Sequence, residues 1–181
     1  MALQGHREPA APGRTEGCEH TIRLRGAMRK RLKKMISEEQ FQTWLAHMDD
    51  ALEAFLARLP AEIRDRLDGS PESLGVLEAW LLERYPTMDA ILEEDEEASH
   101  LDGAARYVGD VFRKALGGHW RLRLNDPKYV FHGLPELWFL EKKDTPDAPH
   151  TLVTASLDRR TGKHLLLVFN GAKECIERNR P

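Results

Sequence analysis

The chain has 181 residues, of which 41% are apolar and 31% are charged, and its formal net charge at pH 7 is -3. This length suits one domain with a substantial core, and the acidic balance argues against a surface that binds nucleic acid broadly. Only two cysteines occur, without a CxxC motif, and no apolar run is long enough to span a membrane, so we expect a cytoplasmic protein without membrane association.

The first 26 residues differ in composition from the rest of the chain. They are rich in Gly, Pro, Arg and Glu and have almost no periodic apolar positions, so they cannot offset the entropy lost on ordering. We predict a disordered tail over 1–26 and a single α+β domain over 27–181. Within this domain we expect a helical part, 27–97, followed by a helix-plus-sheet part, 98–181.

The helical part contains the strongest periodic signal in the chain. Apolar residues recur at steps of three and four between Phe41 and Leu59, which predicts one face of a helix. Ser70 followed by Pro71 has the pattern of an N-cap with proline at the first helical position. We therefore expect a second helix from this point to Tyr85.

An acidic run over 93–97 follows, and its like charges predict a solvated linker or an exposed helix end. Beyond it, Ser99 or Asp102 can cap a third main helix, whose apolar stripe extends to Leu116. The glycines at 117–118 are expected to end this helix, because glycine tolerates positive φ.

After these glycines the apolar period changes from that of a helix to that of a strand. Trp120, Leu122 and Leu124 alternate with polar residues, which predicts a half-buried strand. Short loops then favour an antiparallel meander. We expect its further strands at Tyr129–His132, Leu137–Glu141 and Thr151–Ala155.

The last segment fits either a helix or a strand. Apolar positions from Leu165 to Ile176 fit one helix face, but 165–169 alone fits a buried strand equally well. We favour a helix that begins near 158–161, because the helical step continues through Ile176. The predicted fold class is thus α+β: N-terminal helices, then a long helix packed on a small antiparallel sheet, with a C-terminal helix.

The most distinctive polar string lies just after the last predicted strand. Asp158 is placed to cap a helix, and Arg159 and Arg160 carry planar guanidinium groups that suit carboxylates or phosphates. These three residues are candidate contacts to a ligand or a partner. The more favoured interpretation of the arginines is a structural pairing with Asp126 or Glu136.

The four tryptophans divide between core and interface candidates. Trp44 and Trp80 lie on periodic helix faces, which favours the core. Trp138 is expected in a strand near a loop, and it is the better candidate for a binding surface because aromatic residues are enriched at interface hot spots.

Several motifs of the C-terminal half together resemble a group of uncharacterised bacterial proteins. They are Asp102–Gly109, Gly117–Trp120, Asp126–Lys128 and Leu152–Gly162. The resemblance implies a bacterial, cytoplasmic α+β protein and no particular activity. In the first motif, Tyr107 and Gly109 have the pattern of a helix face on which close packing against a sheet requires a small residue.

The chain is small, acidic and rich in tryptophan, and no motif in it indicates a reaction centre. The leading hypothesis is therefore a non-enzymatic protein-binding protein, of an immunity or other regulatory type, whose partner is another bacterial protein. We expect no metal site and no cofactor, because no motif has the required spacing.

Two alternatives from other functional classes stay open. His119, Asp126, His132 and Asp158 would serve a small hydrolase or a nucleic-acid enzyme if the fold brought them into one cleft. The basic run 29–34 would bind nucleic acid through its phosphates.

Overall fold

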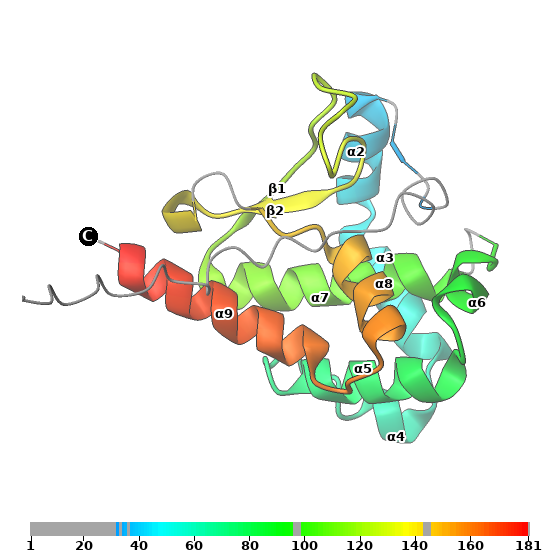
Figure 1. Ribbon diagram of the computed structural model, residues 1–181. Helices are drawn as coiled ribbons and strands as arrows, with labels where there is room; N and C mark the ends of the chain where they lie inside the picture. Colours follow the sequence, from blue (N-terminus) through cyan, green and yellow to red (C-terminus); the bar gives the residue numbers. More distant parts are fainter. Residues whose placement is uncertain (1–31, 33, 36, 96–98, 143–145, 181) are drawn as a thin grey trace, which may run out of the picture.

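The computed structural model describes residues 32, 34–35, 37–95, 99–142 and 146–180 (Figure 1). The predicted tail, 1–26, lies outside the described residues. Of the basic run 29–34, the structure describes Leu32, which is buried, and Lys34, which lies in no helix. The hypothesis of a nucleic-acid-binding helix at this run therefore stays a prediction.

The segment from Phe41 to Leu59, predicted to form one helix, forms two consecutive helices, and a third short helix follows. Helix α2 spans Glu38–Ala46, α3 spans Met48–Arg58 and the short α4 spans Ala61–Arg64. The break falls at His47. The carbonyl of Thr43 accepts the backbone N–H of His47 at 3.2 Å, and Nδ1 of the same residue lies 2.8 Å from it, so the side chain competes with the backbone for this acceptor. The apolar face itself is confirmed, because Phe41, Trp44, Phe55 and Leu59 are all buried.

The next two helices are α5, Ser73–Arg84, and α6, Met88–Leu92. Helix α5 begins two residues later than the predicted proline start. Ser70 still accepts the backbone N–H of Ser73 at 3.3 Å, so it satisfies a donor of the first turn as predicted. The intervening residues form turns with hydrogen bonds between residues three apart.

Helix α7, His100–Leu116, is the longest described helix and lies at the centre of the molecule, with α3 and α8 packed against it (Figure 1). Ser99 caps it by accepting the N–H groups of Leu101 and Asp102. Gly117 ends it at a φ of 79°, the left-handed conformation predicted for the glycine pair. Both ends of this helix were thus predicted from local chemistry.

The sheet contains two short antiparallel strands, β1 at His119–Arg121 and β2 at Glu136–Trp138. Trp120 of β1 covers α7 where Gly109 lies, and any side chain at Gly109 would overlap the indole ring. The predicted close packing of the helix on the sheet at Gly109 is therefore confirmed. The α+β class, with a long helix packed on a small antiparallel sheet, is confirmed with it.

The predicted meander is partly correct: the strand at Leu137–Glu141 exists in a shorter form, whereas those at Tyr129–His132 and Thr151–Ala155 do not. Tyr129–His132 forms consecutive turns, in which Tyr129 N–H bonds Asp126 and His132 N–H bonds Tyr129. The strand predicted at Leu137–Glu141 is shorter and starts one residue earlier, and a single 3₁₀ turn, η2, follows at Leu140–Lys142.

The strand predicted at Thr151–Ala155 is a helix, α8, which spans Pro149–Arg159. A short apolar run cannot distinguish a buried strand from a buried helix. The hydroxyl groups of Thr151, Thr154 and Ser156 donate to carbonyls one turn earlier, so these polar residues are buried without an unsatisfied group.

The C-terminal segment is a helix, α9, at His164–Asn179. The choice of helix over strand for 165–169 is confirmed, but the predicted start near 158–161 is wrong. Those residues end α8 and turn the chain instead, with Arg160 at a φ of 50°. The first N–H groups of α9 donate to Glu78 of α5, a fully buried carboxylate 3.0 Å from His164 N and 2.8 Å from Leu165 N.

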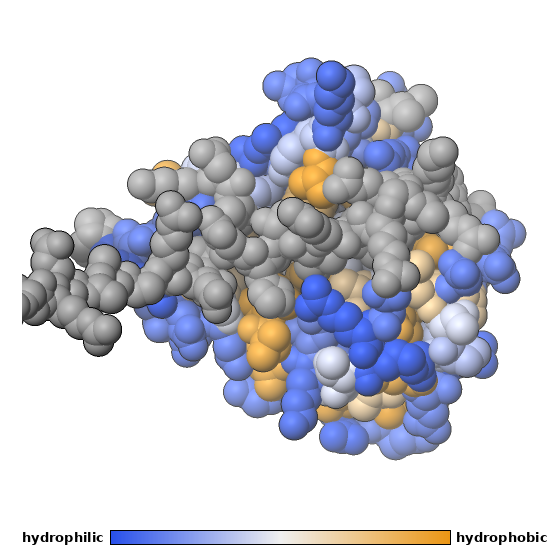
Figure 2. Space-filling view, viewed as in Figure 1, coloured by the Kyte–Doolittle hydropathy of each residue, from blue (hydrophilic) through white to orange (hydrophobic). Residues whose placement is uncertain are grey.

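One apolar core joins these elements, and it extends from α5 through α7 to α8, α9 and the inner face of the sheet. Figure 2 shows that the end of the molecule bearing α2 and the loop between the strands is largely hydrophilic on this face.

Candidate functional site

The two strands direct one row of side chains to the core and another away from it. His119 lies opposite Trp138, and Arg121 lies opposite Glu136. Residues directly opposite in an antiparallel pair point to the same side of the sheet, so these four share one face. The pair between them points to the opposite side, towards α7.

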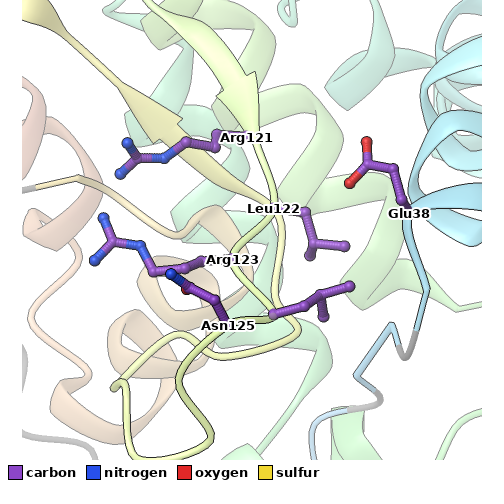
Figure 3. Close-up of a pocket in the computed structure, with 6 residues that line it drawn as sticks. Glu38, Arg121, Leu122, Arg123 and Asn125 are labelled. Atoms are coloured by element: carbon purple, nitrogen blue, oxygen red, sulfur yellow. The ribbon is translucent and has the colours of Figure 1, made fainter.

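The chain after β1 extends this face. In Figure 3, Arg121 and Arg123 extend to one side of the chain, whereas Leu122 extends towards α2, where Glu38 lies. The guanidinium of Arg123 lies 4.1 Å from the ring centre of Tyr129. We define the hairpin face as the surface formed by His119, Arg121, Arg123, Tyr129, Glu136 and Trp138.

A buried carboxylate lies at the centre of the hairpin face. Glu136 is fully buried and accepts hydrogen bonds from Arg121 Nε at 2.8 Å and from the Tyr129 hydroxyl at 2.6 Å. Arg123 Nε lies 3.8 Å from the same carboxylate, close enough for an ion pair but too far for a hydrogen bond. Burial raises the pKa of Tyr129, and the hydrogen bond and charge of Glu136 raise it further, so the phenol remains a donor.

The two guanidinium groups retain unused donors. Arg121 donates a hydrogen bond from Nε to Glu136, but its Nη2 is buried with no hydrogen-bond partner among the described residues. The side chain of Arg123 makes no hydrogen bond within the described ranges and is held by its stacking on Tyr129. Both side chains are about one-third exposed, at 33% and 31%. The hairpin face therefore carries two guanidinium groups, and not all of their N–H groups are hydrogen-bonded.

Aromatic surface adjoins this charge. Trp138 is half-buried; the ring of His119 lies 5.0 Å from the indole, and the Arg121 guanidinium lies 5.5 Å from it. Beside the arginines, a shallow groove of about 540 Å³ runs along the chain after β1. It is lined by Glu38, Arg121, Leu122, Arg123, Leu124 and Asn125 (Figure 3).

The polar corner predicted at Asp158, Arg159 and Arg160 lies elsewhere, at the junction of α8 with α5 and α9. Arg160 donates to the carbonyls of Leu82, Tyr85 and Pro86, all between 2.8 and 3.0 Å, and so caps the end of α5. Its predicted pairing with Asp126 or Glu136 is wrong, because Glu136 pairs with arginines of its own hairpin.

The other two residues of this corner have different surroundings. Asp158 is exposed in the last turn of α8 and caps no helix, contrary to prediction. Arg159 is exposed, and its Nη1 lies 3.3 Å from His164 Nδ1. The structure thus gives Arg160 a structural role and does not bring this corner to the hairpin face.

The four residues of the enzyme alternative do not form a cluster. His119 lies on the hairpin face, and Asp126 and His132 lie in the loop between the strands, whereas Asp158 lies at the end of α8 that meets α5 (Figure 1). No hydrogen bond or ion pair joins any two of them within the described part of the chain. Asp126 instead accepts the backbone N–H of Lys128 at 2.9 Å, as in a tight turn.

One polar cluster that sequence reasoning missed joins α5 to the start of α7. The Tyr85 hydroxyl donates to Glu94 and lies 2.6 Å from His100 Nδ1, and Glu94 accepts the backbone N–H of His100 at 2.9 Å. Burial raises the pKa of Tyr85, and Glu94 raises it further. Tyr85 is only 4% exposed, and the cluster connects the end of α5 to the start of α7.

The position of Glu94 corrects one prediction. The acidic run 93–97 was interpreted as a solvated linker, but within it Glu94 is partly buried and fixes the start of α7. No local pattern distinguishes it from its acidic neighbours, because the residues that it binds come from other elements.

A second missed cluster fixes α2 on α7 and α8. Asp102 accepts from Trp44 Nε1 at 2.8 Å and from Arg106 Nε at 2.6 Å, and it lies 3.3 Å from His150 Nε2. Arg106, 6% exposed at its side chain, donates to the carbonyl of Trp44 and stacks on its ring at 4.1 Å. Only the spacing of Asp102 and Arg106, four residues apart, was a signal visible in the sequence.

Over the described residues, no group of three or more His, Cys, Asp or Glu side chains is arranged to hold a metal ion. In the same part of the chain, no helix is long and apolar enough to cross a bilayer.

Comparisons of the chain with family models, with curated proteins and with solved structures found no match. The resemblance noted in the C-terminal half accordingly stays an expectation.

Proposed function

We propose that this chain is a non-enzymatic protein-binding protein of a regulatory or immunity type, and that it binds another bacterial protein in the cytoplasm. The hairpin face is its binding surface. The observation that carries the proposal is the gathering of Trp138, Arg121 and Tyr129 on the side of the sheet away from α7. Tryptophan, tyrosine and arginine are the residue types most enriched at interface hot spots.

The construction of the hairpin face supports a binding role more than a stabilising one. A buried ion pair such as Arg121–Glu136 adds little to stability compared with apolar residues of similar size. It does fix the position of a guanidinium, and the Tyr129 hydrogen bond fixes the carboxylate in turn. A surface held rigid before binding loses less entropy when a partner docks.

The arrangement of the reactive side chains favours binding over catalysis. General acid–base chemistry needs two groups within hydrogen-bond reach of one substrate. On the hairpin face His119 contacts Trp138, whereas Asp158 lies at the far end of α8. The enzyme alternative therefore has no shared site to support it.

The proposal is tested by affinity purification of the tagged full-length chain from its native host, with quantitative mass spectrometry. Wild type is compared with Trp138→Ala and with Leu167→Ala, which removes an apolar side chain exposed on α9. We expect at least one protein to be enriched equally by wild type and Leu167→Ala and reduced about tenfold with Trp138→Ala. Binding is then repeated with the purified partner.

Circular dichroism and thermal melting confirm that the variants are folded. Recovery of no protein whose enrichment depends on Trp138 would contradict the proposed function. A hydrolytic activity of the purified chain that is lost in a folded His119→Ala variant would contradict it as well.

A further inference from the structure

We infer that the partner segment seated on the hairpin face is acidic, with its carboxylates bound by Arg121 and Arg123. This inference rests on the proposed function and specifies the chemistry of the partner. The local charge of the hairpin face supports it. Two guanidinium groups share the single carboxylate of Glu136, which leaves a positive surplus on a chain whose overall charge is -3.

The geometry of Arg121 indicates a missing acceptor. Its Nε is used by Glu136, whereas Nη2 is buried without a hydrogen-bond partner among the described residues. Because that nitrogen is enclosed, a partner can reach the guanidinium through Nη1, which makes no hydrogen bond among the described residues, and a carboxylate is the acceptor that fits a guanidinium edge.

Arg123 is arranged as the second half of the same receptor. Its guanidinium is stacked on the Tyr129 ring at 4.1 Å, and its Nε is 3.8 Å from Glu136, so its plane is fixed while its N–H groups are not hydrogen-bonded within the described ranges. Arg121 and Arg123 are two residues apart on one side of the chain (Figure 3). Acidic side chains of an extended segment, whose alternate residues share a side, match this spacing.

A protein segment fits better than a nucleic acid. Nucleic-acid surfaces usually combine several cations along a backbone track, whereas this face has two arginines and the groove beside them also contains Glu38. Trp138, beside Arg121, offers a surface for an apolar side chain next to the acidic residues. An extended polypeptide can place acidic and apolar side chains at successive alternate positions, so that both kinds lie on one side of its backbone.

The experiment uses the full-length chain and a fluorescein-labelled peptide in which glutamate, glutamate and leucine stand at successive alternate positions with serine between them. A glutamine-for-glutamate peptide is its control. Binding is measured by fluorescence anisotropy at low and at physiological salt. The test variant is Arg121→Gln with Arg123→Gln. The matched control is Arg58→Gln with Arg178→Gln, which removes the same charge from exposed positions on α3 and α9.

We expect the glutamate peptide to bind wild type and the control variant alike, and to bind the test variant at least tenfold more weakly. Because Arg121 pairs with buried Glu136, its loss can unfold the hairpin. The single variant Arg123→Gln, which breaks no hydrogen bond within the described residues, then carries the test with an expected loss of about threefold or more.

Three results would overturn the inference: equal weakening in both double variants, equal binding of the glutamine peptide, or tighter binding of a thymidine oligonucleotide or of inorganic phosphate. Absence of peptide binding up to millimolar concentration would overturn it too. A host protein captured through Trp138 would still support the proposed function in that case, so the two failures are distinguishable.

Discussion

Gly109 in α7 and Trp120 in β1 lie in direct contact, and the indole ring occupies the space that a Cβ at residue 109 would need. The contact fixes how closely the sheet lies on the central helix. The position of the hairpin face relative to the core therefore depends on a residue without a side chain. The indole is also packed edge-on against Trp44, with 5.0 Å between the ring centres, which restricts its movement.

We predict that Gly109→Ala destabilises the protein by about 1–3 kcal/mol, because overpacking outweighs the better helix propensity of alanine. Gly75, in α5, is the matched control, since a Cβ there meets no atom within 4 Å. Gly75→Ala is expected to be neutral or to stabilise by up to about 1 kcal/mol. Urea unfolding measures both, and equal effects would show that the Trp120 contact does not limit packing.

Glu78 connects α5 to the start of α9 through two backbone hydrogen bonds. We predict that Glu78→Gln costs about 1–3 kcal/mol, because an amide has one acceptor oxygen and its NH₂ group faces donors. Glu83→Gln, on the exposed side of the same helix, is expected to change the free energy of unfolding by less than about 0.5 kcal/mol. Similar losses in both variants would assign the effect to net charge instead.

Arg160 combines a left-handed backbone with a side chain that caps α5. We predict that Arg160→Ala loses about 1–2 kcal/mol, because three carbonyl acceptors lose their donor. Arg160→Gly is expected to lose about 1 kcal/mol less than the alanine variant, since glycine relieves the positive φ. Thermal melting of the two variants decides the point: identical melting temperatures would mean that backbone strain contributes nothing here.

The contribution of Asp102 to the free energy of unfolding depends on pH in the acid range. Burial raises the pKa of this carboxyl, but the hydrogen bond and charge of His150 and the charge of Arg106 outweigh it, and the net shift is downward. A carboxyl with a lowered folded pKa stabilises the fold above its ordinary value near 4 and loses this contribution as the pH falls below it.

We therefore predict that Asp102→Asn is less stable than wild type at pH 6 and that the difference narrows between pH 4 and 2. Unfolding in urea across this pH range measures the narrowing. Asp158→Asn, which changes an exposed carboxyl, is the control and should remain parallel to wild type. A constant gap between wild type and Asp102→Asn at all pH values would show that Asp102 acts through shape rather than charge.

The candidate site was only partly predictable, as Trp138 and the two arginines beside it illustrate. Trp138 was expected at a binding surface because of its residue type, and it lies on the face that we propose for binding. Arg121 and Arg123 were seen only as the polar half of an alternating strand. Their shared carboxylate, Glu136, is 15 residues from Arg121, and no pattern within one segment relates residues across a hairpin.

Local chemistry by itself determined the ends of α7, the periodic helix faces and the α+β class, because caps, glycines and apolar spacing act within a few residues of one another. Tertiary structure alone decided that 151–155 is a helix, that Arg160 caps α5 and that Glu136 pairs with two arginines. An apolar run is compatible with either a strand or a helix, and a charged side chain with many partners. The packing of distant segments selects among them.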